Sequence, residues 1–316
     1  MHKNGFSRRS FLRNVAAGST GAALVSLPAV AHAVTAEAAP EPPWPVTVES
    51  YPLVEPGKAA GLARVKLATK DDIPAAYQEK LRAYAPNLDL TFCRNQEQFR
   101  SEVADAYVIF GSFSRQDLQA ARHLRWIQYT AAGVENILYP ELVDSPIVLT
   151  NMQRMFSPTI SETAIGLLLT LTRGLNHYTL QTREHVWKHV NGLTEISGLT
   201  LGIVGLGGIG TDTAYRAHYG FNMRILAVDP KPLPKPSFVA ELHSLEWLPK
   251  MAPQVDVLLS AAPHTPVSEG MFNELIFRAM KPTAYFINVS RGKLVDTPAL
   301  IRALEEGWIA DRKSVV

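Results

Sequence analysis

The sequence predicts an α/β protein with two parallel-sheet domains, preceded by a segment outside the fold. Short apolar runs alternate with helix-like stretches from about residue 63 to residue 310, and a glycine-rich turn directly follows one of these runs. The first 33 residues differ in composition from the rest. Such alternation is typical of parallel sheets, because each strand needs a crossover to reach the next. At 316 residues with 47% hydrophobic content, the chain is long enough for two cores.

Residues 1–33 resemble a twin-arginine signal peptide. Arg8 and Arg9 begin the motif, a weakly apolar stretch covers 15–30, and Ala31 and Ala33 form a small-residue cleavage pattern. A membrane anchor is the alternative, but the stretch contains Gly, Ser, Thr and Pro, and a span needs about 20 strongly apolar residues. We therefore expect a periplasmic protein with no stable membrane anchor. The proline-rich segment 34–58 predicts a linker.

The first predicted domain covers residues 59–155. Its apolar runs are four to six residues long, as expected for strands, and polar, helix-forming segments separate most of them. In chain order, strands are predicted at Ala63–Ala68, Leu88–Cys93, Ala106–Phe110, Trp126–Thr130 and Ile147–Thr150, and helices at Pro74–Ala83, Gln96–Val103 and Arg115–Arg122.

The second predicted domain covers residues 156–316 and begins with a strongly apolar helix. Ligands of open parallel sheets bind beyond the carboxyl ends of the strands, so the cleft between the domains is the expected site. After the helix Ile160–Arg173, strands are predicted directly before Gly205 and at Arg224–Val228, Val255–Ala261 and Ala284–Val289, and helices at Met271–Met280 and Pro298–Glu306.

The glycine-rich turn after the strand at 201–204 has the G-x-G-x-x-G spacing of a dinucleotide site. Gly205 permits the tight turn, Gly207 lets the backbone approach a pyrophosphate, and Gly210 lets the new helix pack on its strand. The helix start, with Gly208 and Ile209 under the pyrophosphate, offers N–H groups and a positive dipole end to the phosphates. Glycine-rich turns also occur for steric reasons alone, so the spacing needs supporting context.

Asp229 supplies that context. It ends the next predicted strand, nineteen residues after Gly210, where a carboxylate accepts hydrogen bonds from the adenosine ribose hydroxyls. Its charge repels a 2′-phosphate, so NAD is favoured over NADP, although Lys231 nearby softens the preference. An ordinary turn residue before Pro230 is the alternative. Together the two motifs predict a Rossmann-type domain that binds NAD.

Composition excludes several other functions. The formal net charge is +2 and no basic block occurs beyond the N-terminus, so a nucleic-acid surface is not expected. Cys93 is the only cysteine, which excludes an internal disulfide and a cysteine-based metal cluster. His185 and His189 are four residues apart but lack the glutamate of a metalloprotease motif. We expect no metal site.

Four blocks of sequence between about residues 63 and 310 resemble the D-isomer-specific 2-hydroxyacid dehydrogenases. The first is similar to the family's substrate loop, the second to its interdomain helix, and the third to the loop after the fourth strand of the nucleotide domain. The fourth, N-x-S-R-G, is the most specific. The blocks are Trp126–Asn136, Ser161–Arg173, Asp256–Pro266 and Asn288–Asp296.

The resemblance implies a flavodoxin-like substrate domain, and a small 2-hydroxy or 2-keto acid as substrate. It makes Arg291 the catalytic residue, which grips the substrate in a fork and polarises its carbonyl; a surface ion pair is the alternative. Main-chain donors of Ala132 and Gly133 would hold the substrate carboxylate, and Glu135 is expected to start a helix. The resemblance also implies a homodimer and further contacts with the cofactor from Pro263, Thr265, Val289, Ser290 and Arg291.

The sequence departs from the family pattern after Ala310. The family's later glutamate and histidine, which supply the proton, have no counterpart before Val316. We therefore expect a NAD-binding domain that lacks its last strands, a sheet edge exposed after strand 284–289, and impaired catalysis. His264 is a weak substitute acid, because a loop histidine without a carboxylate partner is usually a solvated side chain. A non-catalytic dinucleotide-binding protein and a non-functional truncated remnant remain as alternatives.

Overall fold

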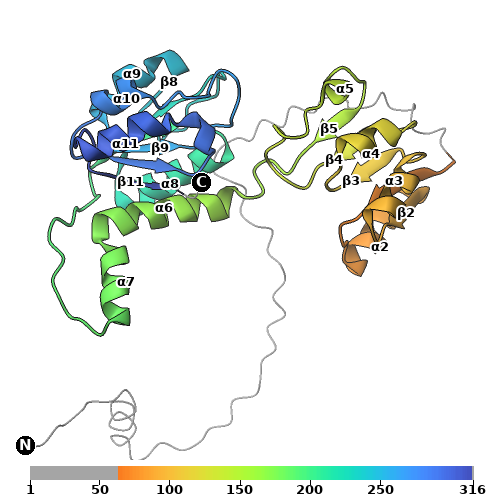
Figure 1. Cartoon of the computed structure of the whole chain (residues 1–316), viewed down its shortest axis with the longest axis horizontal. Coiled ribbons are helices and arrows are strands. Elements are labelled where there is room, and N and C mark those ends of the chain that lie inside the picture. The colour runs from red at the N-terminus through yellow and green to blue at the C-terminus, as the bar shows by residue number, and fades with distance from the viewer. Residues whose placement is uncertain (1–62, 315–316) are drawn as a thin grey trace, which may run out of the picture. The chain divides into compact units, whose positions relative to one another are not determined.

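The computed structural model describes residues 63–314 (Figure 1). The predicted signal peptide at 1–33 and the predicted linker at 34–58 lie outside the described residues. Within the described part the strands form two separate sheets, and every strand pairing is parallel. The predicted α/β class is therefore confirmed. No helix in this part of the chain is long and apolar enough to cross a membrane.

The first sheet has the order β2-β1-β3-β4-β5, which is the predicted flavodoxin-like order. Its central strands are buried because helices cover them: Phe99 and Val103, one turn apart on one helix, pack in a core with Ile109 and Ile127. The elements are β1 Val65–Thr69, α2 Ala75–Tyr84, β2 Leu88–Phe92, α3 Gln96–Val103, β3 Val108–Phe110, α4 Arg115–Ala120, β4 Trp126–Gln128, α5 Pro140–Val143 and β5 Val148–Thr150.

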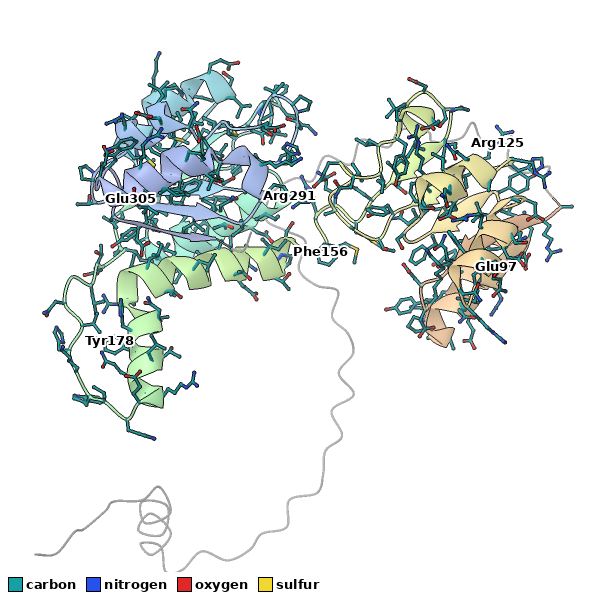
Figure 2. All side chains as sticks on the ribbon, viewed as in Figure 1. Glu97, Arg125, Phe156, Tyr178, Arg291 and Glu305 are labelled. Carbon is teal, nitrogen blue, oxygen red and sulfur yellow. The ribbon has the colours of Figure 1, made fainter. Side chains whose placement is uncertain are left out.

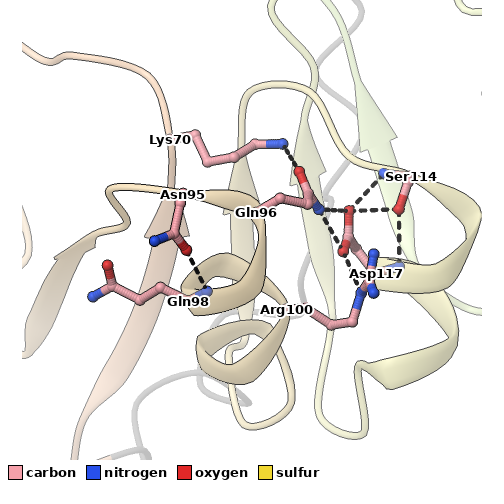
Figure 3. A network of polar contacts seen from close by, with 7 residues as sticks. All are labelled: Lys70, Asn95, Gln96, Gln98, Arg100, Ser114 and Asp117. Carbon is pink, nitrogen blue, oxygen red and sulfur yellow. Dashed lines mark hydrogen bonds and ion pairs between the residues drawn. The ribbon is translucent and has the colours of Figure 1, made fainter.

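A buried polar network joins α3 to α4 (Figure 3). The side chain of Asp117, fully buried, accepts hydrogen bonds from Ser114 N at 2.8 Å, from Gln96 Nε2 at 2.7 Å and from Arg100 Nε at 3.2 Å. Asp117 and Ser114 also form the capping box of α4. Burial raises the pKa of Asp117, but the hydrogen bonds lower it further, so its pKa lies below the usual aspartate value.

We expect Asp117→Asn to lower the free energy of unfolding by about 1–2 kcal/mol, because the amide keeps only part of these hydrogen bonds. A carboxylate whose pKa is lower in the folded than in the unfolded state stabilises the fold at pH values above its unfolded-state pKa. That stabilisation is lost as the pH falls through the folded-state pKa. The difference between the variant and the unchanged chain should therefore shrink below about pH 4 in denaturant titrations. The exposed Asp72, changed to Asn, is the control; an equal loss there contradicts the prediction.

The second sheet has the order β11-β10-β9-β6-β7-β8, which is the doubly wound order of a Rossmann-type domain. It begins after two helices, and short helical turns connect its later strands. The elements are α6 Ser157–Arg173, α7 Leu175–Arg183, β6 Thr200–Val204, α8 Gly208–Phe221, β7 Arg224–Val228, β8 Glu241–His243, the 3₁₀ turn Leu245–Trp247, α9 Leu248–Met251, the 3₁₀ turn Ala252–Gln254, β9 Val257–Ser260, α10 Glu274–Ala279, β10 Tyr285–Asn288, the 3₁₀ turn Gly292–Leu294, α11 Thr297–Glu305 and β11 Asp311–Ser314.

One prediction about this sheet is wrong. The strand at 284–289 was expected to be an exposed edge, but β11 pairs with β10 in parallel, from Asp311 beside Tyr285 to Ser314 beside Asn288. An edge strand needs only backbone N–H and C=O groups, and its polar residues carry no apolar pattern. Gly307, at φ 70°, makes the preceding turn, and Ala310 N donates to Ala284 O at 2.9 Å. The sheet therefore extends one strand further than the sequence predicts.

Helices cover both faces of the second sheet. In Figure 1, α10 and α11 lie on one side, and α6, which packs against α8, lies on the other. The inner strands are therefore near-continuous apolar runs, as parallel strands buried on both faces require. Phe286 on β10 contacts Phe272 and Phe277 with ring centroids 5.0 and 5.4 Å apart. This core fixes the carboxyl ends of β6, β9 and β10, where the predicted site residues lie.

Candidate active site

The glycine-rich turn follows β6 and begins α8. Gly205 has φ +93°, and a Cβ built on it would lie 2.8 Å from the backbone of Ala262, in the loop after β9. Its N–H donates to Val228 O at 2.8 Å. Only glycine fits there without strain, since both the left-handed conformation and the neighbouring backbone exclude a side chain.

The next glycines have different surroundings. A Cβ at Gly207 would meet nothing within 4 Å, whereas one at Gly210 would overlap the carbonyl of Gly205 and lie 3.1 Å from Ile203. A Cβ at Gly208 would overlap Ser157 Oγ at the start of α6. Glycine is thus required at Gly205 and Gly210 because neighbouring backbone leaves no room for a side chain there, while the space at Gly207 is open.

The start of α8 suits an anion. Its N-cap, Gly207, has no side chain, and the first turn contains no acidic residue. By contrast, α3, α10 and α11 are each capped by an Asn or Asp side chain. The first turn of a helix leaves its N–H groups without partners in the helix and carries a partial positive charge. Ile209, partly exposed, lies in this turn.

Asp229 directly follows β7 and faces the glycine turn. One carboxylate oxygen accepts from Leu206 N at 2.8 Å and the other from Lys231 N at 2.9 Å. Each oxygen can accept more than one hydrogen bond, so both still have capacity for ribose hydroxyls. Asp229 therefore lies beside the glycine turn and is joined to its backbone by a direct hydrogen bond, while its contact with a ribose stays a prediction.

Arg291 lies in the loop after β10 (Figure 2), in a turn held by its neighbours. Asn288 Oδ1 accepts from Ser290 N at 3.0 Å and from Ser290 Oγ at 2.8 Å, and Asn288 Nδ2 donates to Arg291 O at 3.1 Å. Ser290 Oγ is also 2.5 Å from Ser260 Oγ at the end of β9. Val289 and Ser290 are buried, so packing as well as hydrogen bonds holds the turn, while the Arg291 side chain is 45% exposed.

The guanidinium of Arg291 meets the predicted substrate loop. A Cβ at Gly133 would overlap Arg291 Nη2, and Arg291 Nε donates to Glu135 Oε1 at 2.5 Å. Ala132, exposed, accepts at its carbonyl from Asn151 Nδ2 at 2.7 Å. The structure therefore brings Arg291, Gly133 and a carboxylate together, although that carboxylate belongs to the chain itself.

Glu135 was expected to start a helix, and this is wrong: it lies in a turn, and the next helix, α5, begins at Pro140. Burial raises the pKa of Glu135, but the hydrogen bond from Arg291 lowers it further, with smaller contributions from the charges of Arg291 and His264. The net pKa of Glu135 lies below its usual value, because a paired carboxylate is easier to keep ionised. Sequence reasoning missed this residue; its acidic side chain two positions after Gly133 was the only signal.

The loop after β9 contains Pro263 and Thr265. Thr265 N donates to Ser268 Oγ at 2.8 Å, and Ser268 Oγ donates to Pro263 O at 2.8 Å, which closes a tight turn. His264 was expected to lack a carboxylate partner, and this too is wrong. Its Nε2 is 3.2 Å from Glu269 Oε2, and its side chain is only 18% exposed.

Comparison with known proteins identifies the chain. Residues 165–312 match the family model described as D-isomer specific 2-hydroxyacid dehydrogenase, NAD binding domain. A glyoxylate reductase of Thermofilum pendens is 32% identical over 244 residues, which are 76% of this chain and 67% of that protein. The chain belongs to the D-isomer specific 2-hydroxyacid dehydrogenase family.

Other members of the family agree with this. A glyoxylate reductase of Thermococcus kodakarensis is 38% identical over 202 residues, which cover 60% of this chain and 59% of that protein. The chain thus spans about three fifths of the length of such curated relatives. The crystal structure of a family protein from Aeromonas salmonicida matches with a TM-score of 0.68 and 28% identity, over 80% of this chain and 81% of that one.

The residues present fit the cofactor of this 2-hydroxyacid dehydrogenase family. Open space at Gly207, a helix start without acidic residues and a half-buried Asp229 at the end of the next strand together match a diphosphate and a ribose. The described residues contain no group of three or more potential metal ligands. The second sheet is the NAD-binding domain of the family.

Proposed function

We propose that this chain binds NAD(H) at the turn 205–210 and interconverts a small D-2-hydroxy acid and the corresponding 2-keto acid. The observation that carries the proposal is the guanidinium of Arg291, which holds a carboxylate beside Gly133. Several relatives are named glyoxylate reductases, which supports a small 2-keto acid as substrate.

Each residue of the site has a separate role in this reaction. Bound NADH supplies the hydride. Main-chain donors of Ala132 and Gly133 hold the substrate carboxylate, and Arg291 binds it in a fork while its charge polarises the C2 carbonyl. Val289 and Ser290 would lie along the nicotinamide side of the bound cofactor, Pro263 and Thr265 would also contact it, and Gly208 and Ile209 would lie under its diphosphate. The substrate must displace Glu135 from Arg291, since the two carboxylates compete for one guanidinium.

The rate of turnover measures whether the chain provides a proton donor, because general acid catalysis contributes about 10²–10⁴-fold. The direct test mixes the full chain with NADH and glyoxylate. Quenching or enhancement of NADH fluorescence measures binding, and loss of absorbance measures turnover. Absence of any NADH binding contradicts the proposal.

A non-catalytic dinucleotide-binding protein is the second candidate. The ion pair between Glu135 and Arg291 favours it, because the guanidinium is already occupied by a carboxylate of the chain. Tight NADH binding without turnover of glyoxylate or hydroxypyruvate supports this candidate, and measurable turnover excludes it.

Asp229 should set the choice between NAD and NADP. We expect Asp229→Asn to raise the affinity for NADPH relative to NADH by about tenfold, equivalent to about 1.4 kcal/mol, because like-charge repulsion of the 2′-phosphate disappears. Fluorescence titration with both cofactors measures the ratio.

Asp256→Asn is the matched control for Asp229→Asn. Asp256 also accepts a backbone hydrogen bond, from Thr200 N at 2.8 Å, but it lies just before β9, at the amino ends of the strands, whereas Asp229 follows the carboxyl end of β7. The control should leave the NADPH to NADH ratio unchanged. An equal shift in both variants would show that lost structure, not lost charge, is responsible.

We also propose that the chain forms a homodimer. Leu175, Leu180, Val186 and Trp187 are all exposed, with Trp187 fully so, on α7 and the segment after it. Figure 1 shows α7 standing away from the second sheet. Exposed apolar side chains of this kind mark interaction sites, and a second copy is the partner that the family resemblance implies. Sedimentation of the purified chain measures whether it is a monomer or a dimer.

Export by the twin-arginine route to the periplasm is likewise our proposal, supported by Arg8, Arg9 and the uncharged stretch that follows. Cell fractionation of the full chain, with both arginines changed to lysine as the comparison, tests it.

A further inference from the structure

The carboxyl ends of three neighbouring strands of the first sheet meet around Asp71. β1, β3 and β4 are paired in register up to their last residues. Asp71 follows β1 by two residues, Gly111 follows β3 directly, and Thr130 follows β4 by two residues. Because β2 lies on one side of β1 and β3 on the other, the order of the strands reverses between β1 and β3. Open parallel sheets bind ligands at such a switch point.

The backbone leaves room for the carboxylate of Asp71 at this switch point. Gly111 has φ +105°, and a Cβ built on it would lie 2.6 Å from Asp71 Oδ2. The backbone N–H of Asp71 donates to Oγ1 of the buried Thr69 at 2.9 Å. Asp71 Oδ2 accepts from Thr130 Oγ1 at 3.2 Å. A side chain at position 111 would strain the backbone and displace the carboxylate, so the glycine keeps Asp71 against the end of β3.

Asp71 forms no ion pair within residues 63–314. Its partly exposed side chain is hydrogen-bonded to a neutral hydroxyl. The preceding residue, Lys70, instead donates to Gln96 Oε1 at 2.6 Å, on α3 (Figure 3). By contrast, the other carboxylate of the candidate site, Glu135, is paired with Arg291. In the described part of the chain, Asp71 therefore places a negative charge at the switch point without a cation to balance it.

Thr130 connects Asp71 to the predicted substrate loop. It lies three residues before Gly133, where Arg291 Nη2 fills the space that a Cβ would need. Three residues span at most about 11 Å in a fully extended chain, and the backbone bends at residues 130–132, which shortens the distance. The charge of Asp71 therefore acts at Gly133 over a distance comparable to the Debye length, about 8–10 Å.

We infer that Asp71 restricts the chain to monocarboxylic 2-keto acids by repelling a second acidic group on the substrate. This rests on the proposed function and names the substrate class of that site. The C1 carboxylate is held at Gly133 by Arg291, and the cofactor belongs to the second sheet, so the carbons beyond C2 extend toward the switch point of the first sheet. A terminal carboxylate there meets the like charge of Asp71, whereas a hydrogen or an alkyl group does not. Such repulsion gives specificity by weakening the wrong ligand.

The test titrates the NADH-bound full chain with 2-ketovalerate and 2-ketoglutarate. The two acids have five carbons each and differ in a terminal methyl group against a terminal carboxylate. Both displace Glu135 from Arg291 through the same C1 carboxylate, so that competition cancels in the ratio of their affinities. The fluorescence of bound NADH measures each affinity, and kcat/KM for the same pair is compared where turnover is measurable.

In the unchanged chain, 2-ketovalerate should bind at least about tenfold more tightly than 2-ketoglutarate, and added salt should narrow the difference. Asp71→Asn should raise the affinity for 2-ketoglutarate by about tenfold, leave 2-ketovalerate and NADH unchanged, and remove the salt dependence. Asp71→Ser, which is also neutral but smaller, should give the same ratio, so that a fold disturbed by one variant is recognised by the other.

Asp72→Asn is the matched control, because Asp72 is the next residue along the chain and is exposed. It should leave the ratio of the two affinities unchanged. An equal shift in the Asp71 and Asp72 variants, or an unchanged ratio in both Asp71 variants, overturns the inference and leaves the proposed function standing. If neither keto acid binds to the NADH-bound chain, the proposed function fails and the inference fails with it, so the two failures are distinguishable.

Discussion

Arg291→Lys is expected to lower kcat/KM for keto-acid reduction by about 10²–10³-fold, the effect of removing one preorganised donor to the developing oxyanion. Lysine keeps the positive charge but lacks the planar fork that binds a carboxylate and a carbonyl oxygen together. Affinity for NADH should change far less, because most of its contacts come from the glycine turn and Asp229. Steady-state kinetics with glyoxylate, beside NADH titration, separate the two quantities.

The geometry of the turn at 288–291 explains why a conservative change should have this effect. Asn288 holds Ser290 through two hydrogen bonds and donates to the carbonyl of Arg291, so the backbone at Arg291 cannot move to bring a shorter contact into place. Lysine must reach the substrate from the same fixed position with a single ammonium group. A loss of less than tenfold would indicate that Arg291 acts through its charge alone.

Arg302→Lys is the matched control for Arg291→Lys. Arg302 on α11 also forms an ion pair, with Glu274 at 2.6 Å, and its side chain is also 45% exposed. Exposed pairs of this kind contribute about 0–1 kcal/mol to stability. We expect kinetics and melting temperature of the control to match those of the unchanged chain. If the control loses activity as well, the arginine changes act through stability and not through the reaction.

The sequence predicts both sheets well because each strand leaves a local pattern. Parallel strands covered on both faces are runs of apolar residues, and the crossover rule then restricts their order. Gly205 and Asp229 were also predictable, since their spacing reflects one strand-turn-helix unit followed by the next strand. The hydrogen bond from Leu206 N to Asp229 forms within the same unit, so it too follows from the local sequence.

Most features that the sequence does not predict depend on residues distant in the chain. β11 consists of polar residues and pairs in parallel with β10. The partner of Glu135 is Arg291, 156 positions later, and no local pattern indicates such a pair. Glu269 is only five residues from His264, yet their contact depends on the turn that Ser268 closes. Side-chain partners across turns and between loops follow from the fold as a whole.

Gly205→Ala should lower stability and Gly207→Ala should lower NADH affinity, although the two glycines are only two residues apart. At Gly205 the added methyl group would lie 2.8 Å from the Ala262 backbone, and φ is +93°. Left-handed backbone costs about 1–2 kcal/mol for alanine and overpacking about 1–3 kcal/mol more. We expect the free energy of unfolding to fall by about 3 kcal/mol, measured by denaturant titration without cofactor.

At Gly207 the methyl group meets no atom of the chain within 4 Å, and φ is −71°. Alanine is a slightly worse N-cap than glycine, but it also restricts the unfolded chain, and these small effects offset each other. We therefore expect unchanged stability. Affinity for NADH should nevertheless fall by more than about tenfold, because the methyl group takes the space that the diphosphate needs.

The pair of glycine variants thus separates folding from cofactor binding at one turn. Gly205→Ala should lose stability first and NADH affinity only as a consequence, while Gly207→Ala should lose affinity with an unchanged melting temperature. If Gly207→Ala binds NADH as tightly as the unchanged chain, the diphosphate does not lie against the start of α8. The proposed function would then need a different cofactor site, because Asp229 is tied to this same turn through Leu206.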